Sequence, residues 1–203
     1  MIKLKKIAAA GFLWAVTLGC AGCGVKADMS KFSENTLAVN KDGSVTELAV
    51  ESFGEAYYSL DDLKTYVNAQ VDAYNSAHPP ASGKEKDKTI TVDEVAVDEE
   101  NARVILTYES SQDYADFNYT KLEVINGAKL SGDAAALSLK DADGAEAGNL
   151  SGLEKPEDYE AVVVYTAQNI VVPGKIAYVS SNVTVLDQSL AQGDGTLAVI
   201  LYH

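Results

Sequence analysis

The segment from about Ser59 to Asn75 places the strongest constraint on the fold, because it is the clearest helix signal in the chain. Five apolar side chains recur on one helical face, namely Leu60, Leu63, Val67, Val71 and Tyr74. Ser59 begins a capping box, in which its hydroxyl satisfies a free backbone N–H of the first turn. Burying such side chains stabilises by about 1.5–3 kcal/mol each, whereas ordering costs ~1–2 kcal/mol for every helical residue. The helix is therefore predicted to pack its apolar face on a sheet.

Runs of β-branched and aromatic residues supply that sheet. The predicted strands are 36–40, 44–51, 88–97, 103–108, 121–126, 160–166, 169–172, 175–180, 183–187 and 196–202. Asp42-Gly43 predicts a hairpin turn, and Asp93-Glu94 interrupts an alternating pattern and predicts a β-bulge. Short helices are expected at 110–118 and 131–139, and an irregular segment at 140–152. The tight turns of the last fifty residues favour an antiparallel meander, so the predicted class is α+β, with a mostly antiparallel sheet carrying the 59–75 helix on one face.

The amino terminus has the pattern of an export signal. Lys3, Lys5 and Lys6 precede an apolar run of 12 residues from Ile7 to Leu18, which is shorter than the ~20 residues of a membrane-spanning helix. A core helix is disfavoured, because a lysine cluster directly beside so short an apolar run suits a soluble fold poorly. The predicted organisation is a signal peptide over 1–22, a flexible polar tether over 23–35 and a single extracytoplasmic domain over 36–203.

The residues that follow this run, Gly-Cys20-Ala-Gly-Cys23-Gly, resemble the lipobox of bacterial lipoproteins. In that motif a small residue precedes a cysteine whose sulfur receives a diacylglycerol. Cys23 is the favoured attachment site, because Ala21 and Gly22 precede it; Cys20 remains the alternative, as does a secretory signal with incidental cysteines. The resemblance implies that a diacylglyceryl-cysteine holds the protein on the outer side of the cell membrane, and two acyl chains are enough for stable anchoring.

Charge and cysteine content limit the kinds of partner and of functional site that are expected for this protein. The formal net charge is −14, and loss of the three lysines of segment 1–22 makes it −17. A chain this acidic is expected to repel nucleic acid and anionic lipid, which leaves cations or basic partners. Both cysteines lie in the signal region, so the domain is predicted to lack disulfides, cysteine nucleophiles and cysteine-based metal sites.

Catalytic groups are sparse, and neither an enzyme nor a cofactor is predicted. His78 precedes two prolines at a helix end, and His203 ends the sequence. Three acidic clusters, Asp93-Glu94, Asp98-Glu99-Glu100 and Glu157-Asp158, lie in or beside expected turns. A glycan hydrolase that uses two carboxylates is kept as an alternative.

No metal site is predicted. The segment from Asp141 to Glu146 shares acidic residues with an EF-hand loop, but that loop has glycine at its sixth position and glutamate at its twelfth. Here Gly144 comes fourth and Gly152 comes twelfth. A flexible acidic loop is favoured, and weak Ca²⁺ binding at Asp141 and Asp143 is left open.

Tyrosine is the enriched aromatic residue, with 11 copies. The main interpretation is that these rings lie at the edge of the core with the hydroxyl in water. The alternative is that Tyr57, Tyr58 and Tyr114 line a groove for a peptide or glycan, because amphipathic rings suit such ligands.

Three blocks, residues 53–63, 108–118 and 172–183, resemble segments of small membrane-anchored lipoproteins from clostridial-type Gram-positive bacteria. The resemblance supports localisation and fold, and it implies no particular activity. The function predicted from the sequence is a cell-envelope lipoprotein that serves as a non-catalytic binding or structural module with an unidentified protein or glycan partner. The alternatives are the hydrolase and an accessory subunit of an envelope transport system.

Overall fold

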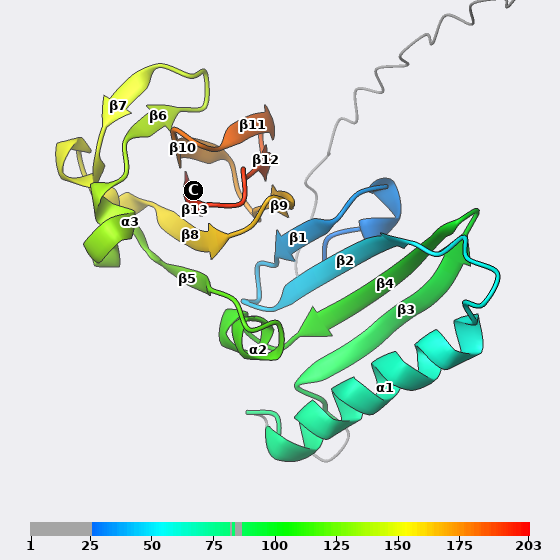
Figure 1. Cartoon of the computed structure of the whole chain (residues 1–203). Coiled ribbons are helices and arrows are strands. Elements are labelled where there is room, and N and C mark those ends of the chain that lie inside the picture. Colours follow the sequence, from blue (N-terminus) through cyan, green and yellow to red (C-terminus); the bar gives the residue numbers. More distant parts are fainter. Residues whose placement is uncertain (1–25, 82, 84–86) are drawn as a thin grey trace, which may run out of the picture.

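Two largely antiparallel sheets and three helices make up an α+β fold, as predicted (Figure 1). The computed structural model describes residues 26–203 except 82 and 84–86. The predicted signal peptide and both candidate lipidation sites, Cys20 and Cys23, lie outside the described residues. Within the described part of the chain, no helix is long and apolar enough to cross a membrane.

The first sheet has seven strands in the order β11-β12-β9-β1-β2-β4-β3. Its strands are β1 (Thr36–Val39), β2 (Val45–Ser52), β3 (Ile90–Asp98), β4 (Asn101–Tyr108), β9 (Asn169–Val171), β11 (Thr184–Asp187) and β12 (Leu190–Gln192). The hairpin predicted at Asp42-Gly43 is confirmed as β1–β2, and β3 and β4 form a second hairpin. All pairs in this sheet are antiparallel except β1 with β9.

The second sheet has six strands in the order β5-β8-β13-β10-β6-β7. They are β5 (Leu122–Asn126), β6 (Leu139–Asp141), β7 (Glu146–Gly148), β8 (Glu160–Tyr165), β10 (Ile176–Ser180) and β13 (Leu197–Tyr202). The predicted meander is wrong, because the chain alternates between the sheets: β9, β11 and β12 join the first, whereas β8, β10 and β13 join the second. Segment 140–152 is also more regular than predicted, since β6 and β7 form a hairpin.

The main helix, α1 (Leu60–Ala77), confirms the prediction for 59–75 and packs on β3. Its N-cap is Ser59, whose hydroxyl oxygen accepts a hydrogen bond from the backbone N–H of Asp62 at 3.3 Å. The other helices are α2 (Ser111–Phe117) and α3 (Gly132–Ala136), with single 3₁₀ turns η1 (Met29–Lys31), η2 (Gly127–Lys129), η3 (Leu150–Gly152) and η4 (Pro156–Asp158).

The core lies between the first sheet, α1, α2 and the second sheet. We call the side of the first sheet that faces these elements its front face, and the opposite side its back face. Alternating side chains of each strand divide between the two faces: Leu37 and Val39 enter the large front cluster with Val71 of α1, whereas Ala38 enters a smaller cluster on the back. The far side of the second sheet is covered by α3 and its neighbours.

Residues 26–35 cover the back face, which differs from the flexible tether predicted over 23–35. Met29 is only 4% exposed and packs with Leu48 and Ile105. The Arg103 guanidinium donates hydrogen bonds to the backbone oxygens of Phe32 at 2.9 Å and Met29 at 3.3 Å. The tether was predicted from small polar residues, but one buried methionine and these backbone contacts hold the segment on the sheet.

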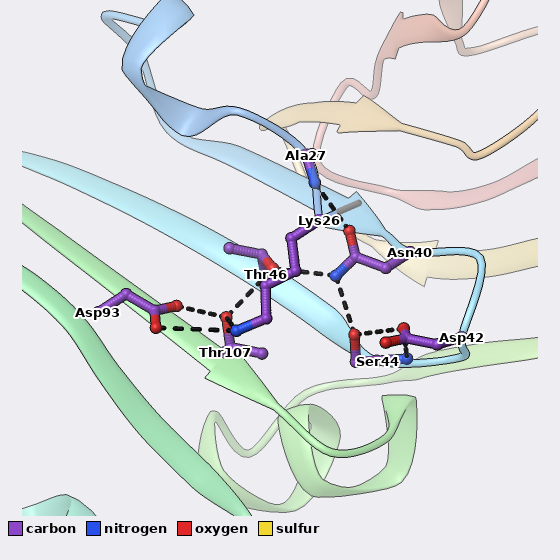
Figure 2. A network of polar contacts seen from close by, with 8 residues as sticks. All are labelled: Lys26, Ala27, Asn40, Asp42, Ser44, Thr46, Asp93 and Thr107. Atoms are coloured by element: carbon purple, nitrogen blue, oxygen red, sulfur yellow. Dashed lines mark hydrogen bonds and ion pairs between the residues drawn. The ribbon is translucent and has the colours of Figure 1, made fainter. Parts of the chain in front are cut away.

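Polar side chains complete the back face at its other end (Figure 2). Asn40 accepts a hydrogen bond from the backbone N–H of Ala27 at 3.0 Å and donates to the Thr46 hydroxyl at 3.0 Å. The Lys26 ammonium donates to the Thr107 hydroxyl at 3.2 Å and lies 3.8 Å from the Asp93 carboxylate. The N-terminal segment is therefore fixed to the sheet by the side chains of Asn40, Asp93 and Thr107.

The predicted bulge at Asp93 and Glu94 is confirmed by a shift in register between Val92 and Glu94. A bulge lets two successive residues oppose one residue of the partner strand. Asp93 reaches Lys26, and the Glu94 carboxylate lies 3.8 Å from Arg103, so both acids serve the back face.

Candidate ligand-binding groove

A groove of about 610 Å³ lies over β4, between α1 and the end of α2. We call it the α1–α2 groove; its lining residues are Tyr66, Val67, Gln70, Ala73, Tyr74, His78, Val104, Leu106, Asp116, Phe117 and Tyr119. It exists because α1 packs on the edge strand β3, whereas α2 is only seven residues long and covers one end of the sheet. Val104 and Leu106 of β4 form an aliphatic floor between the two helices.

Tyr74 is the central aromatic residue of this groove. Its ring stacks on the His78 imidazole with centroids 4.1 Å apart and meets the Phe117 ring edge-on at 5.6 Å. Its hydroxyl donates a hydrogen bond to the Asp113 carboxylate at 3.2 Å. Burial, together with the Asp113 charge, raises the pKa of Tyr74 to about 12, so the hydroxyl stays protonated at neutral pH. One wall of the groove is therefore a fixed aromatic surface.

Tyr119 forms the opposite wall and has an unusual backbone conformation. The backbone N–H of Thr120 donates to the Ala115 carbonyl at 3.0 Å, which is the long hydrogen bond of a Schellman motif at the end of α2. Tyr119 occupies the left-handed position of this motif with φ +50°, where glycine is usual. Its side chain is 97% exposed. A left-handed conformation costs roughly 1–2 kcal/mol for a residue with a side chain, and burial of the ring does not offset that cost.

Asn118, the residue before Tyr119, is held by a polar cluster beneath α2. The Tyr108 hydroxyl donates to the Glu47 carboxylate at 2.7 Å. The Asn118 amide donates to the Tyr108 hydroxyl oxygen at 3.1 Å and to the Tyr114 carbonyl at 3.2 Å. Burial raises the pKa of Glu47, although the hydrogen bonds from Tyr108 and Asn118 oppose that shift. This cluster fixes the end of α2 on the sheet and so fixes the position of Tyr119.

The charge of the lining is one-sided. Asp116 is its only carboxylate, and the lining includes neither lysine nor arginine. One Asp116 oxygen accepts a hydrogen bond from the Gln112 amide at 2.8 Å, which orients the carboxylate on the α2 surface. The groove therefore combines exposed aromatic rings, an aliphatic floor and one acid.

Of the three tyrosines predicted for a ligand groove, Tyr57 and Tyr58 meet edge-on with ring centroids 4.8 Å apart, whereas Tyr114 lies apart from them. Tyr57 and Tyr58 lie before α1 with 76% and 44% of their surface exposed, and Tyr58 stacks on Phe53 at 4.8 Å. Tyr114 is 4% exposed and packs against Tyr108 in the core, with centroids 5.2 Å apart.

The sequence carries only a partial signal for the residues that line the α1–α2 groove. Its α1 residues recur at intervals of three and four, as the side chains of one helical stripe do. Tyr66, Gln70 and Ala73 follow this spacing on α1. The contribution of Tyr119 depends on how α2 sits beside α1, which no local pattern encodes.

The remaining candidate groups are dispersed. Asp98 ends β3, Glu99 and Glu100 form the β3–β4 turn, and Glu157 and Asp158 belong to η4. His203 lies beside Tyr159, with ring centroids 4.6 Å apart.

The Asp141 carboxylate is occupied within its own turn. It accepts backbone hydrogen bonds from Asp143 at 3.0 Å and Ala145 at 2.8 Å, which shape the β6–β7 hairpin. Over residues 26–203, apart from the four positions left undescribed, no group of three or more His, Cys, Asp or Glu residues is placed to hold a metal ion.

Comparisons with protein-family models, with curated proteins and with solved structures each find no match.

Proposed function

We propose that this protein is a lipid-anchored, non-enzymatic binding module of the cell envelope, and that the α1–α2 groove is its ligand site. The observation that carries the proposal is Tyr119, a fully exposed ring held in a strained backbone conformation at the wall of a 610 Å³ groove. Strain of this kind persists where the surrounding structure enforces it, and it concentrates at ligand sites.

The position of the N-terminal segment supports the anchoring part of the proposal. Lys26 is fixed on the back face, so only Gly24 and Val25 separate it from Cys23. Fully extended, these two residues add at most about 7 Å to the distance between Cys23 and Lys26. A lipid on Cys23 holds the back face near the membrane and leaves the groove, which is on the front face, directed away from it.

The groove does not favour the hydrolase alternative. Glycosidases of the usual type need two carboxylates on either side of the scissile bond. Among the described lining residues, Asp116 is the only acid. Aromatic and aliphatic surfaces with few polar groups are instead typical of binding sites.

Anchoring is tested by metabolic labelling with a tagged fatty acid in cells that produce the native chain. Cys23→Ala is expected to abolish the label and to release the protein from membranes or leave it unprocessed, whereas Cys20→Ala retains the label. Labelling of the Cys23→Ala variant would assign the lipid to Cys20. Absence of label from the native chain would contradict lipid anchoring.

Binding is tested by placing a photo-crosslinking phenylalanine analogue at position 66 in intact cells. The matched control carries the analogue at Tyr165, a tyrosine of β8 outside the groove that is 48% exposed. A defined adduct is expected from position 66 alone and is expected to disappear in the Tyr119→Gly background. Equal adducts at both positions, or none at position 66, would contradict a ligand site in the groove.

A further inference from the structure

The proposed function leaves open which ligand the groove accepts. The geometry points to a basic polypeptide segment, in which a lysine or arginine side chain lies over Tyr66 and Tyr119 beside Asp116, and a neighbouring apolar side chain contacts the floor. This inference rests on the proposed function. It commits to a polypeptide, and a glycan is an outcome that the test distinguishes.

Charge complementarity is the first argument. The formal net charge of −14 attracts cations toward the surface, and the lining adds Asp116 without any lysine or arginine. Two basic side chains near this part of the first sheet, Lys26 and Arg103, are engaged on the opposite face with Asp93 and Glu94. The front face therefore offers a negative site that these two cations do not neutralise.

The exposed rings are the second argument. Tyr66 is 65% exposed and Tyr119 is 97% exposed, so their faces are available to a ligand. The negative face of an aromatic ring attracts ammonium and guanidinium groups, more strongly when the cation is partly removed from water. A groove with such rings near a carboxylate provides both interactions for one basic side chain.

Asp116 is prepared for a cationic partner. It is exposed at the end of α2, and the hydrogen bond from Gln112 engages only one of its two oxygens. The other oxygen accepts no hydrogen bond from the residues that the structure describes. A carboxylate in this state accepts a charge-assisted hydrogen bond without losing an existing contact.

The aliphatic floor of the groove favours a peptide ligand over a glycan ligand. Val104 and Leu106 of the floor, with Val67 of α1 beside them, offer aliphatic surface. This surface favours an apolar side chain over sugar hydroxyls, which lose hydrogen bonds to water there. A ligand peptide in which basic and apolar residues alternate would place its basic side chains against the aromatic walls and its apolar side chains on the floor.

The test uses a tryptophan reporter in the full-length chain. Trp14 is the single tryptophan, so Trp14→Phe with Tyr66→Trp places the only indole in the groove, and Trp14→Phe with Tyr165→Trp is the matched control. The probe is a short synthetic peptide of alternating Lys and Leu, compared with the same peptide carrying Glu in place of Lys and with tri-N-acetylglucosamine. A saturable fluorescence change is expected for the Lys peptide at position 66 only.

Two variants examine the contacts in that reporter background. Tyr119→Gly is expected to weaken binding about tenfold, and Asp116→Asn about fivefold. Asp133→Asn removes one charge from an exposed position of α3 and is expected to leave affinity unchanged. Thermal unfolding checks that Tyr119→Gly folds, and it is expected to unfold at a higher temperature because glycine relieves the positive φ.

Failure of the basic-peptide inference can be distinguished from failure of the groove as a binding site. Affinity that is unchanged by Tyr119→Gly, or reduced equally by Asp116→Asn and Asp133→Asn, would overturn the basic ligand and indicate general charge attraction. Saturation by the oligosaccharide without a response to the Lys peptide would overturn the ligand class and leave the groove as a binding site. A crosslinked adduct at position 66 in cells, without a fluorescence response to the Lys peptide, would also overturn the ligand class and leave the groove as a binding site.

Discussion

The two faces of the first sheet use the same strands and are covered in different ways. On the back, Thr46 and Thr107 join a polar network with Asn40 and the N-terminal segment, and hydrophobic contacts of Met29 complete the cover. On the front, Leu106 lies under two helices that leave a groove between them. One face is closed by the N-terminal segment, and the other keeps aromatic surface exposed.

This difference separates stability from recognition. On the back face, Asn40, Thr46 and Thr107 are hydrogen-bonded and Met29 is buried, so changes to these residues are expected to lower the free energy of unfolding. On the front face, Tyr119 is strained and exposed, so its removal is expected to stabilise the fold and weaken binding. Opposite signs of the change in stability on removal of the Met29 and Tyr119 side chains are the central expectation.

The largest effect is expected for Met29→Ala, which empties a buried site on the back face. Loss of a buried methionine side chain costs 2–5 kcal/mol in well-packed cores, and we expect about 3 kcal/mol here. Urea denaturation measures the loss, and peptide binding to the groove is expected to be unchanged. Lys31→Ala, an exposed position in the same 3₁₀ turn, is the control and is expected to change stability by less than about 0.5 kcal/mol. Equal effects of the two substitutions would show that the N-terminal segment does not hold the back face.

The next effect is expected for Tyr108→Phe on the front face. The variant keeps the ring that packs against Tyr114 but removes the hydroxyl that joins Glu47 to Asn118. Unpaired partners in a largely buried cluster are expected to cost about 2 kcal/mol in denaturant unfolding. Tyr165→Phe, at an exposed position, is the control. A neutral Tyr108→Phe would mean that the cluster does not fix the end of α2.

A smaller effect is expected for Ser59→Ala, which removes the N-cap of α1 and so loosens one wall of the groove. Loss of such a cap costs about 1 kcal/mol. Ser59→Asp keeps an acceptor at this position and is expected to restore stability. Thermal unfolding of both variants measures the difference, and identical values for them would exclude a capping role.

The smallest effect is a change in pH dependence with Glu47→Gln. Burial raises the pKa of Glu47 in the folded state above its ordinary value of 4.5, so the folded state binds its proton more tightly than the unfolded chain does. Stability from this group is therefore full below about pH 4.5 and is lost as pH rises through the folded-state pKa. The Gln variant lacks this loss, so its free energy of unfolding is expected to gain on the native value between acidic and neutral pH. A constant difference across that range would contradict the assignment.

Features set by neighbouring residues were predictable from the sequence. The cap at Ser59, the turn at Asp42-Gly43 and the bulge at Asp93 each depend on a few adjacent side chains. The division into two sheets was not predictable, because β9 and β12 are only three residues long and β9 pairs with β1, whose residues lie 133 positions earlier in the chain. The groove was missed for the same reason: Tyr119 acquires its role only when α2 settles beside α1, and the tyrosines closest to the predicted helix start, Tyr57 and Tyr58, lie elsewhere.

The parallel pairing of β1 with β9 has a consequence for the order of folding. Thr36 pairs with Asn169, a partner 133 positions later in the chain. Contacts over such a separation must overcome the entropy of closing a long loop and are typical of slow-folding topologies. The β1–β2 and β3–β4 hairpins can form early from residues close together in the chain, but one edge of β1 stays unpaired until β9 arrives. During synthesis, that open strand edge favours wrong association between nascent chains.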